Sequence, residues 1–239
     1  MKYVVCIPDG CADLPVPELG GRTPLEAANT PNLDALAARG TVGRAQVIPE
    51  GLPPGSDVGN MSIFGFDPAQ FHTGRAPIEA AALGLSLRDD QIAFRCNLVT
   101  VENDIMIDYA GGSPSSDSAA IVINQLNEEL GSEEVSFHPG VSFRHSLVAP
   151  SDWIETTCVP PHDLTGDPLV LPTGSGSDPL IQIMENSKQV LAESDLQATQ
   201  VWLWGQGFMP KMPSFLEMYG KSAGLVTAVD LLRGIATLT

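Results

Sequence analysis

The chain has 239 residues, enough to bury a substantial core in one or two domains. It contains 29 acidic residues and 12 lysines and arginines, a net charge of -17, which argues against nucleic acid or an anionic membrane as a partner. Adaptation for solubility or to a saline environment is the alternative explanation of the acidic excess. Four cysteines without Cys-x-x-Cys spacing, and the lack of a signal peptide or an apolar run of about 18 residues, predict a cytoplasmic protein.

The N-terminal part shows strand, loop and helix signals in turn. The apolar run over residues 3–8 predicts a buried strand, and Asp9 follows it directly. In open α/β sheets that end of a strand is where ligands bind, so Asp9 is a candidate metal ligand, with an ordinary turn as the alternative. Further along, we expect helices over 31–39, 56–64 and 77–85 and an extended segment over 42–48.

The middle of the chain predicts a compact β-β-α-β unit. Strand patterns at 92–101 and 104–109 meet at a turn, Glu102-Asn103, which is typical of a hairpin. A helical pattern and two extended patterns follow, at 119–130, 135–137 and 143–148. We predict an inserted α+β domain over residues 76–177, within a discontinuous α/β core made of 1–75 and 178–239. The second core segment is predicted to contain a helix at 179–192, strands at 199–204 and 225–229, and a helix at 230–235.

Ser56 lies in a Gly- and Pro-rich turn just before the predicted helix over 56–64. A serine hydroxyl is a weak nucleophile unless a base or a metal ion activates it. No histidine follows before His72, so the local sequence favours a metal. A cation held by Asp9 and Ser56 would lower the pKa of the Ser56 hydroxyl and prepare it to attack phosphorus. The alternative is that Ser56 merely caps the helix.

Longer motifs carry a specific resemblance. Four stretches, residues 7–10, 23–34, 55–68 and 94–97, are similar to the archaeal-type, cofactor-independent phosphoglycerate mutases of the alkaline phosphatase superfamily. Further matches, at 143–145, 160–163, 202–207 and 228–232, extend the resemblance over essentially the whole chain. It implies an alkaline-phosphatase-like core with an inserted substrate domain, and interconversion of 3-phosphoglycerate and 2-phosphoglycerate. By resemblance, Ser56 becomes the phosphoserine.

The resemblance also implies the cofactors. The complete enzyme would hold two divalent metal ions, Mn2+, Mg2+, Co2+ or Zn2+, and would need no bisphosphoglycerate. Asp9 and Ser56 would be metal ligands, whereas the remaining ligands would lie in a C-terminal part that this chain lacks. We therefore expect an incomplete core, and we expect the chain by itself to be inactive as a mutase.

Positive charge is scarce in the predicted insert. Between residues 75 and 178 the basic residues are Arg75, Arg88, Arg95 and Arg144, and guanidinium groups suit carboxylate and phosphate. We expect Arg95 and Arg144 to contact substrate anions, with a solvated strand face or a carboxylate partner as the alternatives. Four further candidates for substrate binding are Asn60, Arg75, His162 and Asp163; loop hydrogen bonding is the alternative for the last two.

One segment departs from the family pattern. Residues 108–114 read Asp-Tyr-Ala-Gly-Gly-Ser-Pro, where the family usually places His or Arg after Asp-Tyr-Ser-Ala-Gly. This puts one substrate contact in doubt. His72 stands where tyrosine is common, and we assign it no role beyond that of a loop residue.

Three functions therefore remain open. The first is the mutase, acting on a small phosphorylated substrate. The second is a phosphatase or another phosphotransferase on the same scaffold, in which water could discharge Ser56. The third is a fragment that binds but does not catalyse. A domain able to close over the substrate excludes water and favours the mutase. The sequence does not predict the oligomeric state.

Overall fold

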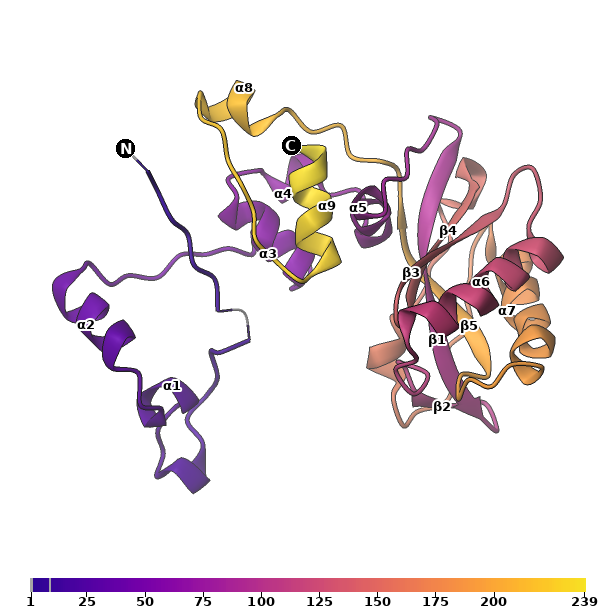
Figure 1. The fold of residues 1–239 in the computed structure, drawn as a ribbon, viewed down its shortest axis with the longest axis horizontal. Coiled ribbons are helices and arrows are strands. Elements are labelled where there is room, and N and C mark those ends of the chain that lie inside the picture. The colour runs from indigo at the N-terminus through magenta and orange to yellow at the C-terminus, as the bar shows by residue number, and fades with distance from the viewer. Residues whose placement is uncertain (1, 9) are drawn as a thin grey trace. The chain divides into compact units, whose positions relative to one another are not determined.

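The computed structural model describes residues 2–8 and 10–239. The chain forms two compact units, Met1–Gln46 and Val47–Thr239, which Figure 1 shows as a ribbon. No helix in the described part of the chain is both long enough and apolar enough to cross a lipid bilayer.

The first unit contains short helices: η1 (Pro17–Leu19), α1 (Pro24–Ala27) and α2 (Pro31–Arg39). Helix α2 has the predicted bounds. The predicted strand over 3–8 is wrong, because the described residues 2–8 and 10–46 form no strand beyond an isolated bridge. Residues 42–48, predicted to be extended, do not pair into a strand either. The side chain of Val4 is 91% exposed. An apolar run becomes a buried strand only when neighbouring strands cover it, and the described part of this unit supplies none.

The second unit is organised around an antiparallel sheet. Its strands are β1 (Gln91–Glu102), β2 (Ile105–Asp108), β3 (Ser136–Val141), β4 (Arg144–Pro150) and β5 (Gln200–Gly207). Their order is β2-β1-β4-β3, and β5 also pairs with β1. The predicted hairpin is confirmed, because Asn103 and Asp104 both have positive φ, 50° and 60°, between the paired strands β1 and β2.

Two helices pack with one face of the sheet. Helix α6 (Ser116–Leu130) packs with β3, and α7 (Ser177–Ala192) packs with β5 and α6 (Figure 1). Both contain the predicted helices. Alternate residues of β1, such as Phe94 and Leu98, join the main hydrophobic core with these helices. Side chains alternate along a strand, so Arg95 and Asn97 point to the opposite face.

That opposite face is contacted by α5 (Arg75–Ala82). Ala76 and Ala80 of α5 pack on Ala93 of β1, and the small side chains let the helix lie close to the strand. Helix α5 also packs with α9 (Asp230–Leu238), so α5 lies between α9 and the sheet (Figure 1). A second hydrophobic core, containing Met61 and Ile78, joins these helices to α3 (Ser56–Ile63).

The remaining elements are short: α4 (Pro68–Phe71), η2 (Ser151–Trp153), η3 (Pro161–Leu164) and α8 (Phe215–Tyr219). The predicted strand over 225–229 is wrong, because this segment is irregular and Val226 is fully exposed. Strand β5, predicted within the second core segment, pairs with β1 of the predicted insert. The sheet therefore extends past residue 177, and the division into residues 76–177 and the two core segments stays a prediction.

His145 lies on the core face of β4, since it pairs with Cys96 in the strand register. Its Nδ1 accepts a hydrogen bond from the amide of Gly140 at 2.9 Å. Burial lowers the pKa of His145 from 6.5 to about 3, so the side chain is neutral in the folded protein at neutral pH.

This buried histidine predicts a loss of stability in acid. Below pH 6.5 the unfolded chain binds a proton at His145, whereas the folded chain does not until the pH approaches 3. The free energy of unfolding should therefore fall by up to about 1.4 kcal/mol per pH unit inside this window because of this residue. Urea unfolding of wild type and His145→Asn between pH 7 and 5 measures the difference in slope. Equal slopes would show that His145 does not contribute.

Candidate functional site

The face of the sheet that carries Arg95 gathers several polar side chains. In the strand register Arg95 lies opposite Ser146 of β4 and Trp204 of β5, while Asn97 lies opposite Arg144. Residues opposite each other in a pleated sheet point to the same side. Arg95, Asn97, Arg144 and Trp204 therefore share one face, the face that α5 contacts.

Glu79 of α5 holds two arginines on this face. Its Oε2 lies 2.7 Å from Nε of Arg95, and its Oε1 accepts a hydrogen bond from Nε of Arg75 at 2.9 Å. Arg95 is only 4% exposed and Glu79 only 8%. Of the two alternatives for Arg95, the solvated strand face is therefore wrong, and the carboxylate partner is observed. One carboxylate between two guanidinium groups leaves an excess of positive charge.

Trp204 supports Arg95 from the other side. The Cζ atom of Arg95 lies 4.4 Å from the centroid of the indole ring, within the range of a cation–π interaction. The indole Nε1 donates a hydrogen bond to Oδ1 of Asn97 at 3.2 Å. The amide of Asn97 donates in turn to the carbonyl of Tyr109 at 3.4 Å. This network fixes the plane against which the guanidinium lies.

Arg95 remains positively charged despite its burial. Its pKa is lowered to about 10: burial is the largest cause, Glu79 acts against it, and the charges of Arg75 and Arg144 add to the lowering. This pKa is well above neutral pH. A buried cation with a surplus of positive neighbours can accommodate an anion, because a second negative group would neutralise charge that Glu79 alone does not.

The other residues predicted to bind substrate differ in their burial and in their contacts with the residues around Arg95. Arg144 is partly buried, and its Cζ lies 4.8 Å from the centroid of the Phe143 ring. The ring of His162 packs edge-on against Trp204, with centroids 5.4 Å apart. Burial lowers the pKa of His162, and the charges of Arg75 and Arg95 act in the same direction. Asp163 is exposed, 3.7 Å from Nε2 of His162.

The segment that departs from the family pattern forms a turn at the end of β2. Both carboxylate oxygens of Asp108 accept backbone hydrogen bonds at 2.8 Å, from the amides of Ala110 and Gly112. The Tyr109 ring packs against those of Phe143 and His162. The turn therefore brings an aromatic side chain toward the histidine.

Ser56 is exposed at the first position of α3. Gly55 occupies the N-cap position, so the interpretation of Ser56 as a helix cap is wrong. The side chain of Asn60 turns back along its own helix: its amide donates a hydrogen bond to the carbonyl of Ser56 at 2.8 Å. Asn60 thereby helps to hold the turn that carries the Ser56 hydroxyl.

Asp57 and His72 form a pair that the sequence did not reveal. The carboxylate Oδ2 of Asp57 lies 2.8 Å from Nε2 of His72. Burial raises the pKa of Asp57, but the hydrogen bond and charge of His72, with smaller effects of the Val58 amide and Arg75, outweigh it and lower the net pKa. Asp57 is therefore ionised at neutral pH. His72 lies in the loop after α4, as expected, and its side chain contacts Asp57 there.

Sequence reasoning missed Glu79, Trp204, Asp57 and His72. For Glu79 a signal was present, since it follows Arg75 by four positions, the spacing of an ion pair on one helix face. Nothing in the sequence indicated that Trp204 lies under Arg95, because that contact depends on the pairing of β5 with β1.

The described residues contain no group of three or more His, Cys, Asp and Glu side chains that could hold a metal ion. Asp9 lies outside the described residues, so its pairing with Ser56 stays a prediction. Asp57, the carboxylate next to Ser56, is already bound to His72. Of the two metal ligands that the resemblance implies for this chain, the structure describes only Ser56.

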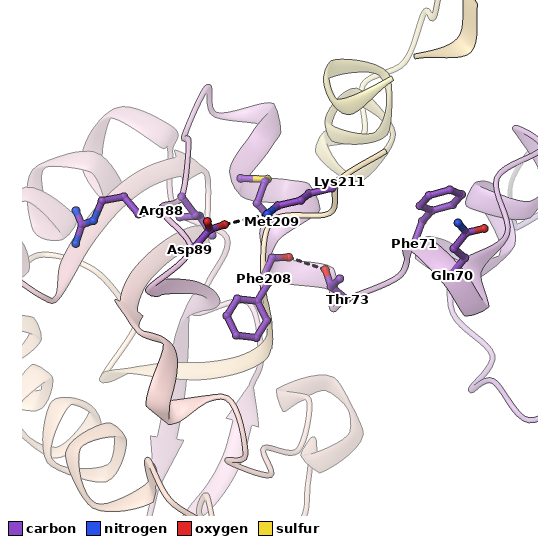
Figure 2. Close-up of a pocket in the computed structure, with 9 residues that line it drawn as sticks. Gln70, Phe71, Thr73, Arg88, Asp89, Phe208, Met209 and Lys211 are labelled. Carbon is purple, nitrogen blue, oxygen red and sulfur yellow. Dashed lines mark hydrogen bonds and ion pairs between the residues drawn. The ribbon is translucent and has the colours of Figure 1, made fainter. Parts of the chain in front are cut away.

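A pocket of about 490 Å³ lies elsewhere in the second unit, lined by Gln70, Phe71, Thr73, Leu87, Arg88, Asp89, Phe208, Met209 and Lys211 (Figure 2). Its cations are already paired, Lys211 with Asp89 at 3.0 Å and Arg88 with Asp90 at 2.9 Å. None of the predicted site residues that the structure describes lines this pocket.

Comparison with known proteins places the chain in a family. A sequence model of the 2,3-bisphosphoglycerate-independent phosphoglycerate mutases matches residues 37–197. A protein of that name from Methanosarcina acetivorans is 50% identical over 98% of this chain and 62% of its own length. A Geobacter sulfurreducens protein named as a probable member is 43% identical over 98% of this chain and 63% of its own length.

Two solved structures are also similar. A Pyrococcus horikoshii protein matches with a TM-score of 0.69 and 28% identity, covering 96% of this chain and 57% of its own. The cofactor-independent phosphoglycerate mutase from Thermoplasma acidophilum matches with a TM-score of 0.52 and 27% identity, covering 96% of this chain and 66% of its own. The chain thus spans about 62% of the length of the curated relatives that it matches. The chain belongs to the 2,3-bisphosphoglycerate-independent phosphoglycerate mutase family.

Proposed function

We propose that this chain carries the nucleophile and the substrate-anion site of a phosphoglycerate mutase that interconverts 3-phosphoglycerate and 2-phosphoglycerate. The observation that supports it most is the pair Arg75 and Arg95 held by Glu79 and Trp204, with the charge of Arg144 acting on Arg95 from the same sheet face, in a protein whose net charge is -17. A substrate with a phosphate and a carboxylate needs this kind of concentrated positive charge.

In this proposal Ser56 takes the phosphoryl group. Its Oγ forms a bond to phosphorus while the bond from phosphorus to one glycerate oxygen breaks, and the serine proton passes to that oxygen. In the return step the other glycerate hydroxyl takes the phosphoryl group and gives its proton back to Oγ. Arg95 and Arg144 hold the anionic groups of the glycerate in between, with Arg75 beside them. His162 and Asp163 lie at the rim as candidates for orienting the substrate, while Asn60 supports the serine turn.

The proposal includes the architecture that the family resemblance implies. Residues 1–75 and 178–239 would belong to an alkaline-phosphatase-like core, and residues 76–177 to an inserted substrate domain. Two divalent ions would complete the site in the whole enzyme, with Asp9 and Ser56 among their ligands. We infer a protein that works on a small phosphorylated substrate in the cytoplasm, without bisphosphoglycerate.

Phosphorylation of Ser56 tests this function. We expect the complete enzyme that the resemblance implies, incubated with 3-phosphoglycerate and manganese, to gain one phosphoryl group detectable by intact mass, and its Ser56→Ala variant to gain none. Ser62→Ala, which changes another serine of the same helix, should behave as wild type. Incorporation that survives in Ser56→Ala would identify a different nucleophile.

The same experiment distinguishes the alternatives. Steady release of inorganic phosphate without formation of 2-phosphoglycerate would favour the phosphatase. Binding of 3-phosphoglycerate by the complete enzyme without any phosphorylation would favour the third function, a protein that binds but does not catalyse.

A further inference from the structure

The carboxylate of Asp57 folds back over the turn that carries Ser56. Asp57 is 9% exposed, and a Cβ atom at Gly55 would lie only 2.3 Å from its Oδ1. Its other oxygen, Oδ2, is bound to His72 at 2.8 Å. Asp57 thus occupies the space beside the Gly55-Ser56 turn, and its contact with His72 holds the carboxylate in that position.

His72 belongs to a connector that is itself fixed to the end of β5. It follows α4 directly, and the hydroxyl of the next residue, Thr73, donates to the carbonyl of Phe208 at 2.6 Å (Figure 2). Just beyond, a Cβ at Gly74 would lie 2.1 Å from the carbonyl oxygen of Gln206. The two backbones cross with no room for a side chain.

The end of β5 also carries Trp204, whose ring contacts Arg75 and Arg95. Trp204, only a few residues before this crossing, lies under Arg95. A continuous series of packed groups therefore runs from the anion site through the crossing at Gly74 to His72, and from there through Asp57 to the Ser56 turn. Rigid contacts of this kind can hold two parts of a site in a fixed relation.

We propose that His72 is a positioning residue for Ser56. It acts through Asp57 and holds the Gly55-Ser56 turn in a fixed position relative to the segment 72–74 and to the sheet face that carries Arg95. The role of Ser56 in this statement rests on the proposed function, whereas the mechanical role of His72 in holding the turn does not. No contact of His72 with the substrate is needed.

The first arm of the test measures the turn directly. The amide of Gly59 donates to the carbonyl of Gly55 at 2.9 Å, the first hydrogen bond of α3, so its hydrogen exchange reports on the turn. We expect His72→Phe to speed exchange at Gly59 by roughly tenfold or more, as loss of a hydrogen bond to a charged group does. Exchange in β5, at the amide of Val201 for example, which donates to the hydroxyl of Ser187 at 3.0 Å, should not change.

Two further variants make the comparison specific. His72→Gln keeps an N–H donor for Asp57 and should restore slow exchange at least in part. His138→Phe removes a histidine whose Nε2 lies 2.9 Å from the hydroxyl of Ser136 in β3, and should leave Gly59 unchanged. Exchange in His72→Phe equal to wild type would overturn the proposal. Equal acceleration in α3 and β5 would also overturn it, because that would mean a general loss of stability.

The second arm concerns the chemistry. In the complete enzyme, with 3-phosphoglycerate as the probe, His72→Phe should slow phosphorylation of Ser56 by roughly tenfold or more while its affinity for the ligand stays within about twofold. His72→Gln should recover the rate. If wild type is not phosphorylated at all, the proposed function fails for this chain, and the exchange arm still decides the role of His72.

Discussion

Replacing Arg95 by methionine is expected to weaken the binding of 3-phosphoglycerate by at least roughly 30-fold. Arg95 is 4% exposed, lies 4.4 Å from the centroid of the Trp204 ring, and remains charged in the folded protein. Truncating one partner of a buried charge pair costs about 2 to 5 kcal/mol, and each 1.4 kcal/mol is about a factor of ten in affinity. Titration calorimetry at neutral pH measures the loss.

The control for this variant is Arg88→Met. Arg88 lies in the same predicted insert, but its side chain is 65% exposed and its ion pair is with the exposed Asp90. Ion pairs at the surface contribute little, so binding should change by less than about twofold. An affinity in Arg95→Met equal to wild type would contradict the assignment of Arg95 to the anion site.

Glu79 allows a sharper version of the experiment. Loss of Arg95 also leaves Glu79 with Arg75 alone, so the weaker binding could come from an uncompensated carboxylate that repels the ligand. The double variant Arg95→Met with Glu79→Gln separates the two causes. If Arg95 contacts the ligand, the double variant binds as weakly as Arg95→Met. If Arg95 only neutralises Glu79, the double variant recovers.

The elements that could be predicted from the sequence are those whose signals are local. The helical spacing of apolar residues in α6 and α7 is a property of each helix alone. The hairpin of β1 and β2 is indicated by two adjacent strand patterns and the turn between them. The run over 3–8 looks like a buried strand for an equally local reason. Whether it forms one depends on neighbouring strands that its own residues do not specify, and Val4 is exposed instead.

The candidate site divides in the same way. Arg95 and Arg144 could be selected because cations are rare in the predicted insert, and Ser56 because of its turn. Their partners could not, because the contacts are not local: Glu79 reaches Arg95 from α5, and Trp204 reaches it from β5. The bond between Asp57 and His72 spans two helices and the turn between them. Such contacts follow only from the packed structure.

The largest expected loss of stability comes from a residue outside the site, Gly234 of α9. This helix crosses α5 so closely that a Cβ at Gly234 would lie 1.8 Å from the carbonyl oxygen of Ile78. That oxygen is backbone, so relief requires moving one helix away from the other. The movement would open the core that contains Ile78, Leu231 and Ile235.

Gly234→Ala should therefore destabilise the second unit by about 2 kcal/mol. Overpacking a core costs about 1 to 3 kcal/mol, occasionally more, and a clash with backbone places this site at the upper end. The better helix propensity of alanine returns roughly 1 kcal/mol, which is too little to compensate. Urea unfolding followed by tryptophan fluorescence measures the change, since Trp153, Trp202 and Trp204 all lie in this unit.

Gly59→Ala is the matched control, because it makes the same substitution at a buried position of another helix in the same unit. There the nearest atom to the added Cβ would be the Cδ1 methyl of Ile48 at 3.4 Å, an ordinary contact. The gain in helix propensity then prevails, and stability should stay equal or rise by up to about 1 kcal/mol. Equal effects of the two variants would mean that α9 can shift away from α5 at little cost. In that case the contact at Gly234 would not be what holds these two helices together.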